Sequence, residues 1–142
     1  MANIVPFSFK GELLSGTHNF ATGGDGFKIA LYTSNPYSTS STVVLTTNEV
    51  SSSGSSNYER KTLASQAVAS GTAVASVDFA DSTWANASFT AAGAAIYNDD
   101  KSDKLVVVLD FNGAKTATNG DFTISFPDPS TASNAIISLT SS

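Results

Sequence analysis

The chain has 142 residues, of which 41% are hydrophobic and 13% are charged, and its formal net charge is −5. This composition excludes a highly charged disordered chain, and the longest aliphatic run, residues 105–109, is far shorter than the roughly 20 residues of a membrane-spanning helix. The absence of Cys excludes a disulfide framework, and the acidic balance, with Arg60-Lys61 as the single adjacent basic pair, argues against nucleic-acid binding.

The N-terminal stretch predicts an arm over residues 1–20 that contains one short helix, within a single domain spanning residues 1–142. Pro6 suits a first helical turn and Gly16 suits a C-terminal stop, while Gly11 destabilises the helix interior by roughly 1 kcal/mol relative to Ala. So short a helix needs its apolar side chains to dock on its own sheet or on a neighbouring subunit. Those side chains are the candidate assembly contacts: Phe7, Phe9, Leu13 and Leu14.

Strand signals begin after the turn-rich residues 21–26. Phe27, Ile29 and Leu31 alternate with other residues, which predicts a strand with one core face over residues 27–33. The β-branched run at residues 42–47 predicts a second strand. The Ser-rich residues 51–57 predict a flexible surface loop.

The second half of the chain is more regular. Residues 72–79 alternate strictly, and the runs at 94–97 and 104–111, joined by the polar turn 98–103, predict a hairpin. The run 105–109 is apolar at every position, so we expect a central strand that is covered on both faces. Shorter strands follow at 122–126 and 135–139. Seven to nine short strands predict an all-β fold: a single-domain antiparallel β-sandwich, or a jelly-roll-like domain, with a short N-terminal helix.

The candidate catalytic residues do not assemble into a recognisable motif. His18 is the single His, no Gly-x-Ser-x-Gly elbow is present, and the carboxylates fall at predicted strand ends and turns. A hydrogen-bonded structural His is therefore the favoured interpretation, and we expect no catalytic residues. A carboxylate pair for glycoside hydrolysis is a much weaker alternative.

Cofactor and metal motifs are equally incomplete. The Gly-rich residues 23–26 precede a strand, whereas a phosphate-binding loop follows one. Asn98, Asp100 and Ser102 imitate the spacing of a calcium loop, but Asp103 and Leu109 replace its Gly and Glu. We therefore expect a hairpin turn there, with no metal and no cofactor.

Small uncharged side chains dominate what remains. The chain has 23 Ser, 16 Thr and 19 Ala, and surfaces with few charges pack against neighbours at a low desolvation cost. This composition favours a component of an assembly. A glycan-binding face is the alternative, and it would use the larger aromatic residues: Tyr32, Tyr37, Tyr58, Trp84 and Tyr97.

The order of the segments resembles small virion proteins of tailed bacteriophages, a group found among cyanophages and related marine phages. The similarity covers most of the chain, through residues 8–18, 27–34, 47–50, 77–79, 91–98, 108–111 and 120–127. The family often carries Gly-x-Gly-Tyr after its Glu-Val pair. Here Glu49-Val50 leads instead into the Ser-rich loop and Tyr58, so loop-specific contacts do not carry over.

The resemblance implies a β-rich, non-enzymatic virion structural protein, with capsid decoration (cement) as its leading role. Such proteins sit on the capsid surface, commonly as homotrimers, and clamp adjacent capsomers by binding the major capsid protein. The N-terminal arm would then be the clamp. A tail or neck component and a glycan- or receptor-binding virion module, which would use the turn 98–103, are the alternative roles.

Overall fold

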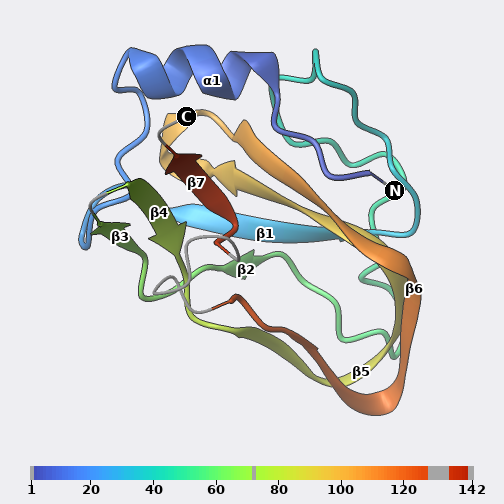
Figure 1. The fold of residues 1–142 in the computed structure, drawn as a ribbon. Helices are drawn as coiled ribbons and strands as arrows, with labels where there is room; N and C mark the ends of the chain where they lie inside the picture. Colours follow the sequence, from blue (N-terminus) through green and yellow to red (C-terminus); the bar gives the residue numbers. More distant parts are fainter. Residues whose placement is uncertain (1, 72, 128–134, 141–142) are drawn as a thin grey trace.

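The structure is a computed structural model that describes residues 2–71, 73–127 and 135–140. Strands β2-β1-β5-β6 form one sheet and β3-β4-β7 form a second, and all pairs are antiparallel (Figure 1). The prediction of an all-β fold with a short N-terminal helix is confirmed, in its sandwich-like form. The elements are α1 (Phe7–Leu14), β1 (Phe27–Tyr32), β2 (Lys61–Thr62), β3 (Ala67–Ser70), β4 (Val74–Asp78), β5 (Ser82–Asn98), the 3-10 turn η1 (Asp99–Lys101), β6 (Lys104–Ile124) and β7 (Ile137–Thr140).

Helix α1 begins and ends at the residues that the sequence indicated. Pro6 occupies the N-cap, and Gly16 adopts a φ of 71°, the left-handed conformation that glycine tolerates best. The N–H groups of Gly16 and Thr17 donate to the carbonyls of Leu13 and Glu12, at 3.2 and 2.9 Å. These two hydrogen bonds form a Schellman motif, which satisfies carbonyl groups at the end of the helix.

The larger sheet separates two apolar clusters. In β1, Phe27, Ile29 and Leu31 face the main core, as their alternation predicted, whereas Ala30 and Tyr32 face a second cluster. The main core also contains Val77 of the smaller sheet, so the two sheets pack around shared apolar residues. The second cluster lies under the loop that follows β1, through Tyr37, Val44 and Leu45.

The apolar run in β6 is buried on both faces, but β6 is not central. Val106 and Val107 face the main core, while Leu105 and Val108 face the second cluster. The outer edge of this part of β6 is covered by the N-terminal segment, because Ile4 exchanges two backbone hydrogen bonds with Val108, at 3.0 and 2.9 Å. The run therefore correctly predicted burial and wrongly predicted a central place in the sheet.

The expected strand at residues 42–47 is absent. Val43 forms one isolated bridge to Lys104, and Thr42 accepts a hydrogen bond from the N–H of Leu105 at 2.9 Å. These β-branched residues lie along the other end of the β6 edge as a loop. Val44 and Leu45 are half-buried there because they pack against the second cluster, and not because they form a strand of the sheet.

Strands β5 and β6 form one long bent hairpin where the sequence suggested separate short strands. Their pairing runs from Asn98 and Lys104 down to Ser82 and Ile124, with register breaks, the largest around Gly93. Opposite that break, Asn112 and Gly113 have φ values of 54° and 111°. These bulges bend the hairpin, so that its distal half, which includes Trp84 and Phe122, curves around the main core (Figure 1).

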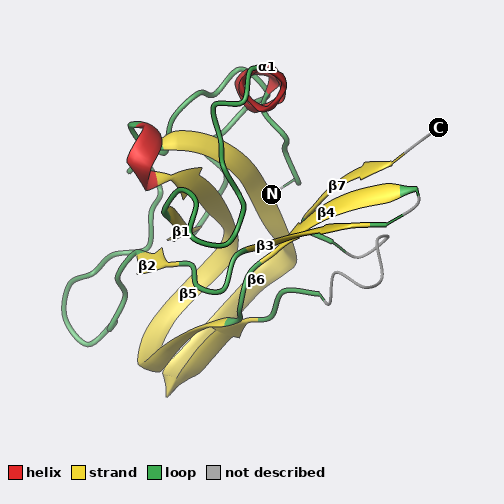
Figure 2. Ribbon diagram, turned by 90° about the vertical axis from the view of Figure 1, so that its left-hand side faces the viewer, coloured by secondary structure: helices red, strands yellow, loops and turns green. Residues whose placement is uncertain are grey.

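The smaller sheet contacts the main core at one end and projects from the body of the molecule at the other. Figure 2 shows β4 and β7 extending away from the larger sheet, with α1 above them. Val77 and Ile137, which pair across β4 and β7, contact the main core. The opposite end of β7, at Leu139, is exposed.

Candidate functional site

The structure divides the four candidate contacts of α1 into two pairs. Phe9 is 1% exposed and lies in the main core, and the partly buried Leu13 packs against that core. Phe7 is 65% exposed and Leu14 is 91% exposed. The helix therefore docks on its own chain through Phe9 and Leu13, and it presents Phe7 and Leu14 outward.

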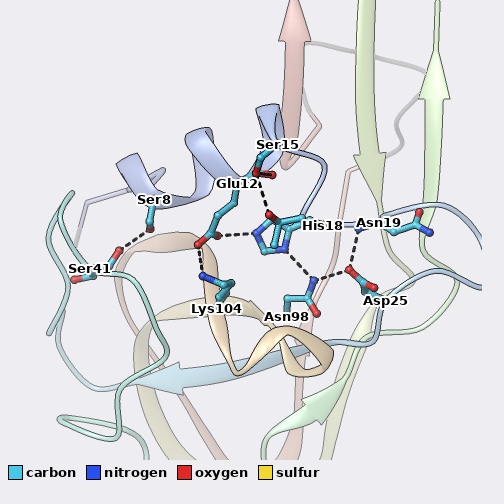
Figure 3. Close-up of polar contacts among 10 residues, drawn as sticks. Ser8, Glu12, Ser15, His18, Asn19, Asp25, Ser41, Asn98 and Lys104 are labelled. Atoms are coloured by element: carbon cyan, nitrogen blue, oxygen red, sulfur yellow. Dashed lines mark hydrogen bonds and ion pairs between the residues drawn. The ribbon is translucent and has the colours of Figure 1, made fainter.

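A chain of polar contacts, which we call the helix latch, fixes α1 to the larger sheet (Figure 3). Its members are Glu12, His18, Asp25, Asn98 and Lys104. Lys104 Nζ donates to Glu12 Oε1 at 2.5 Å, and the second carboxylate oxygen of Glu12 lies 2.8 Å from Nε2 of His18. The imidazole of His18 is fully buried. The predicted structural role of His18 agrees with this geometry.

Asp25 determines the tautomer of His18. Nδ2 of Asn98 lies 2.9 Å from Oδ2 of Asp25 and 2.9 Å from Nδ1 of His18. A carboxylate only accepts hydrogen bonds, so the amide nitrogen faces Asp25 and gives its second N–H to Nδ1. The ring then carries its proton on Nε2 and donates it to Glu12. Both ring nitrogens are occupied within the chain, so the buried imidazole holds the latch together.

The latch predicts a loss of stability in acid. Burial alone would raise the pKa of Glu12, but the hydrogen bonds from Lys104 and His18 and the charge of Lys104 lower that pKa below its ordinary value of 4.5. A carboxylate with a depressed folded-state pKa contributes stability above its ordinary pKa, and that contribution is lost as pH falls through the folded value. We expect Glu12→Gln to lower the free energy of unfolding at neutral pH and to flatten its decline below about pH 4.5, measured by urea denaturation across pH.

Glu59→Gln is the matched control for this pH series. The Glu59 side chain is 75% exposed and pairs with Lys61 only at 3.7 Å, so its removal should leave the curve unchanged. If the free energy of unfolding fell equally steeply in acid for wild type and for Glu12→Gln, the stabilising role of the latch carboxylate would be contradicted.

A second polar cluster joins β1 to the segment before β2. Nε and one terminal nitrogen of Arg60 donate to the two carboxylate oxygens of Glu49, both at 2.8 Å, and the Tyr58 hydroxyl donates to Glu49 at 2.7 Å. Burial would raise the pKa of Glu49, but the hydrogen bonds from Arg60 and Tyr58 lower it below its ordinary value. The hydroxyl of Tyr58 also accepts from the N–H of Leu31 at 3.0 Å. The cluster is satisfied internally and supports the packing of β1.

The aromatic residues considered for glycan binding are all in the interior. Trp84 is buried and donates its indole N–H to the carbonyl of Glu59 at 2.7 Å, so it fills the core. The four Tyr residues considered with it are also buried: Tyr32, Tyr37, Tyr58 and Tyr97. None of them offers a ring face to a sugar from the surface.

The turn that follows β5 is used for internal contacts. Asn98 belongs to the latch, and Asp100 accepts a hydrogen bond from the N–H of Gly26 at 2.6 Å. Within residues 2–71, 73–127 and 135–140, no three His, Asp or Glu side chains gather where they could hold a metal ion. In the same residues no helix has both the length and the apolar character to cross a membrane.

An apolar groove runs between α1 and the smaller sheet, and the sequence alone did not indicate it. Its two halves, of about 440 and 450 Å³, share Leu13, Ile137 and Leu139. Val5 lines one half and Val68 lines the other, and both are exposed. The groove brings together residues that are up to 134 positions apart, which is why periodicity within one segment could not reveal it.

Searches against protein-family models, curated proteins and solved structures found no match for this chain. Among the described residues, the large exposed apolar side chains are Val5, Phe7, Leu14, Val43, Val68 and Leu139. Five of these six belong to α1 or to the groove beside it, so α1 and this groove are the candidate functional site.

Proposed function

We propose that the protein is a non-enzymatic structural protein of a phage virion, and that it decorates the capsid by binding the major capsid protein. The virion role comes from the resemblance in segment order. The observation that carries the binding role is the exposure of Phe7 and Leu14 on a helix that is anchored to the protein's own core. Exposed apolar side chains that gather on one face of a protein commonly mark an interaction site.

The anchoring of α1 makes it suited to binding. Its C-terminal end is closed by the Schellman motif, Glu12 is held by Lys104 and His18, and Ser8 Oγ donates to the carbonyl of Ser41 at 3.2 Å. A rigid contact surface loses less conformational entropy when it binds than a mobile arm does. This favours a helix that binds as a preformed surface over an arm that folds on the capsid.

The most direct test of the clamp uses surface substitutions. We expect the double variant Phe7→Ser/Leu14→Ser to lose binding to capsids stripped of this protein, because the variant removes the apolar contact. Its thermal unfolding should stay close to wild type, since substitutions at such exposed positions usually change stability by no more than about 0.5 kcal/mol. Deleting residues 1–16 would be a poorer test, because it also removes Phe9 from the core.

Val43→Ser is the control, because Val43 is 41% exposed on the loop along β6 and outside α1 and its groove. It should leave capsid binding intact. Unchanged binding by the double variant would refute the clamp.

Immunogold labelling of intact virions tests the location: label over the head supports decoration, and label at the neck or tail supports the tail-component alternative.

A further inference from the structure

The two outer strands of the smaller sheet each have one described partner. β3 and β7 both pair with β4, and no other described residue pairs with either of them. The unpaired N–H and C=O groups of an edge strand form a template for another strand. Figure 2 shows this sheet projecting from the body, where a second molecule could approach it.

The larger sheet protects its edges, and the smaller sheet does not. β2 is only two residues long and carries Lys61, and the proximal edge of β6 is covered by Ile4. The distal part of β6 carries Lys115 and Asp121. Short length, charge and coverage are the usual protections against edge-to-edge pairing. The sequence of β7, Ile-Ser-Leu-Thr, contains neither charge nor Pro.

The edge at β7 is also the more apolar of the two. Ile137 and Leu139 line the groove beside α1, and Leu139 is 58% exposed. At the start of β3, by contrast, the side chain of Gln66 donates to the carbonyls of Ala21 and Asp25, which places that loop next to this end of the strand. An added strand would therefore bury more apolar surface at β7.

We propose that β7 pairs antiparallel with β7 of a second copy of this chain, about a two-fold axis. The uncharged sequence of β7 favours a second copy as the occupant. Each chain carries a net charge of −5, so two copies repel, and the repulsion is smallest where the contacting strand has no charged residue. Apolar residues alternate with hydroxyl residues in β7, so a second β7 would place apolar side chains beside the apolar side chains of the first.

The symmetry limits the register to pairings centred on a residue of β7. A two-fold axis perpendicular to the sheet keeps each residue on its own face, so groove-facing residues must oppose groove-facing residues. Centring the axis on Ser138 satisfies this condition and places Leu139 opposite Ile137 of the second copy. The apolar contact then occurs twice, and each Leu139 reaches the groove side of the other copy's strand.

The first experiment measures the mass of the purified protein by light scattering after size exclusion. The monomer is 14.6 kDa, and we expect a concentration-dependent shift to twice that mass. Leu139→Lys should weaken dimerisation by about tenfold or more, because it places an ammonium group beside buried apolar side chains. Val43→Lys, at an exposed site elsewhere, should not change the mass profile, and circular dichroism checks that both variants fold.

The second experiment tests the register by disulfide cross-linking. The chain has no Cys, so a single Ser138→Cys substitution gives an unambiguous signal. Directly opposed residues in antiparallel strands have Cα atoms about 4.5–5.5 Å apart, within the range of a disulfide. We expect Ser138→Cys to form dimers on a non-reducing gel, and Ser70→Cys, at the end of β3, to stay monomeric.

Three results would overturn the proposal. The first is a monomer at every concentration without cross-linking of Ser138→Cys. The second is a dimer that is insensitive to both Ser138→Cys oxidation and Leu139→Lys. The third is a trimer whose cross-links form only when the Ser70→Cys and Ser138→Cys proteins are mixed, because that pattern indicates pairing of β7 with β3 around a three-fold axis. Both experiments use the purified chain alone, so their outcome is independent of the proposed virion role.

Discussion

Replacing Phe9 with Ala is expected to lower the free energy of unfolding by about 3–5 kcal/mol, the usual range for removing a buried Phe side chain. The Phe9 ring is 1% exposed and lies 5.2 Å from the His18 ring and 6.1 Å from the Phe20 ring, measured between ring centres. Its removal leaves a cavity between α1 and the larger sheet. Urea denaturation followed by circular dichroism measures the change.

Phe7→Ala is the matched control for this experiment. It deletes the same side chain from the same helix, but at a position that is 65% exposed, so we expect a change of no more than about 0.5 kcal/mol. The effect on capsid binding should be ranked the other way. Among folded protein of the two variants, Phe7→Ala should lose more capsid binding than Phe9→Ala. Equal stability losses at the two positions would mean that α1 does not dock through its Phe9 face.

The contrast between Phe7 and Phe9 marks a limit of the sequence analysis. Helical spacing groups Phe9 with Leu13, and Phe7 with Leu14, but it does not say which pair faces the protein's own core. That choice is made by residues distant in sequence, such as Phe20 and the latch residue Lys104. The boundaries of α1 were predictable because Pro6 and Gly16 act locally.

The strands show the same division between local and distant information. Alternation correctly assigned the core face of β1, and the apolar run in β6 correctly predicted burial on both faces. Residues 42–47 have strand propensity but lie along the β6 edge as a loop, because propensity does not determine which backbone finds a continuous partner. The bend at Gly113 likewise depends on pairing across the hairpin, so the sequence suggested two short strands there.

The polar side chains that could have formed a chemical site are bonded within the chain. His18 and Glu12 are the residues best suited to chemistry, but they bond to each other within the latch. Arg60 is likewise bonded to Glu49. The exposed apolar side chains of α1 and of its groove are therefore the candidate contacts for a partner. Stability and the proposed binding would therefore depend on different side chains of the same small helix, which allows each to be tested without the other.

Replacing Arg60 with Met is expected to lower the free energy of unfolding by about 3 kcal/mol. The Glu49 side chain is only 14% exposed, and without the guanidinium group it would keep its charge with Tyr58 as its remaining side-chain donor. Removing one partner of a buried ion pair is strongly destabilising because the other charge stays desolvated. The aliphatic Met side chain keeps part of the packing over the Tyr97 ring, whose centre lies 5.4 Å from the guanidinium carbon.

A double-mutant cycle separates the ion pair from this packing. Arg60→Met/Glu49→Leu should cost less than the sum of the two single variants, by about 1–3 kcal/mol, because the second substitution removes the charge that the first left unpaired. The same cycle at Lys61 and Glu59, an exposed pair at 3.7 Å, should give a coupling of no more than about 1 kcal/mol. If the losses at Arg60 and Glu49 were additive, the two side chains would be acting through separate contacts. The stabilisation of β1 would then come from the hydroxyl of Tyr58 and the apolar packing around it.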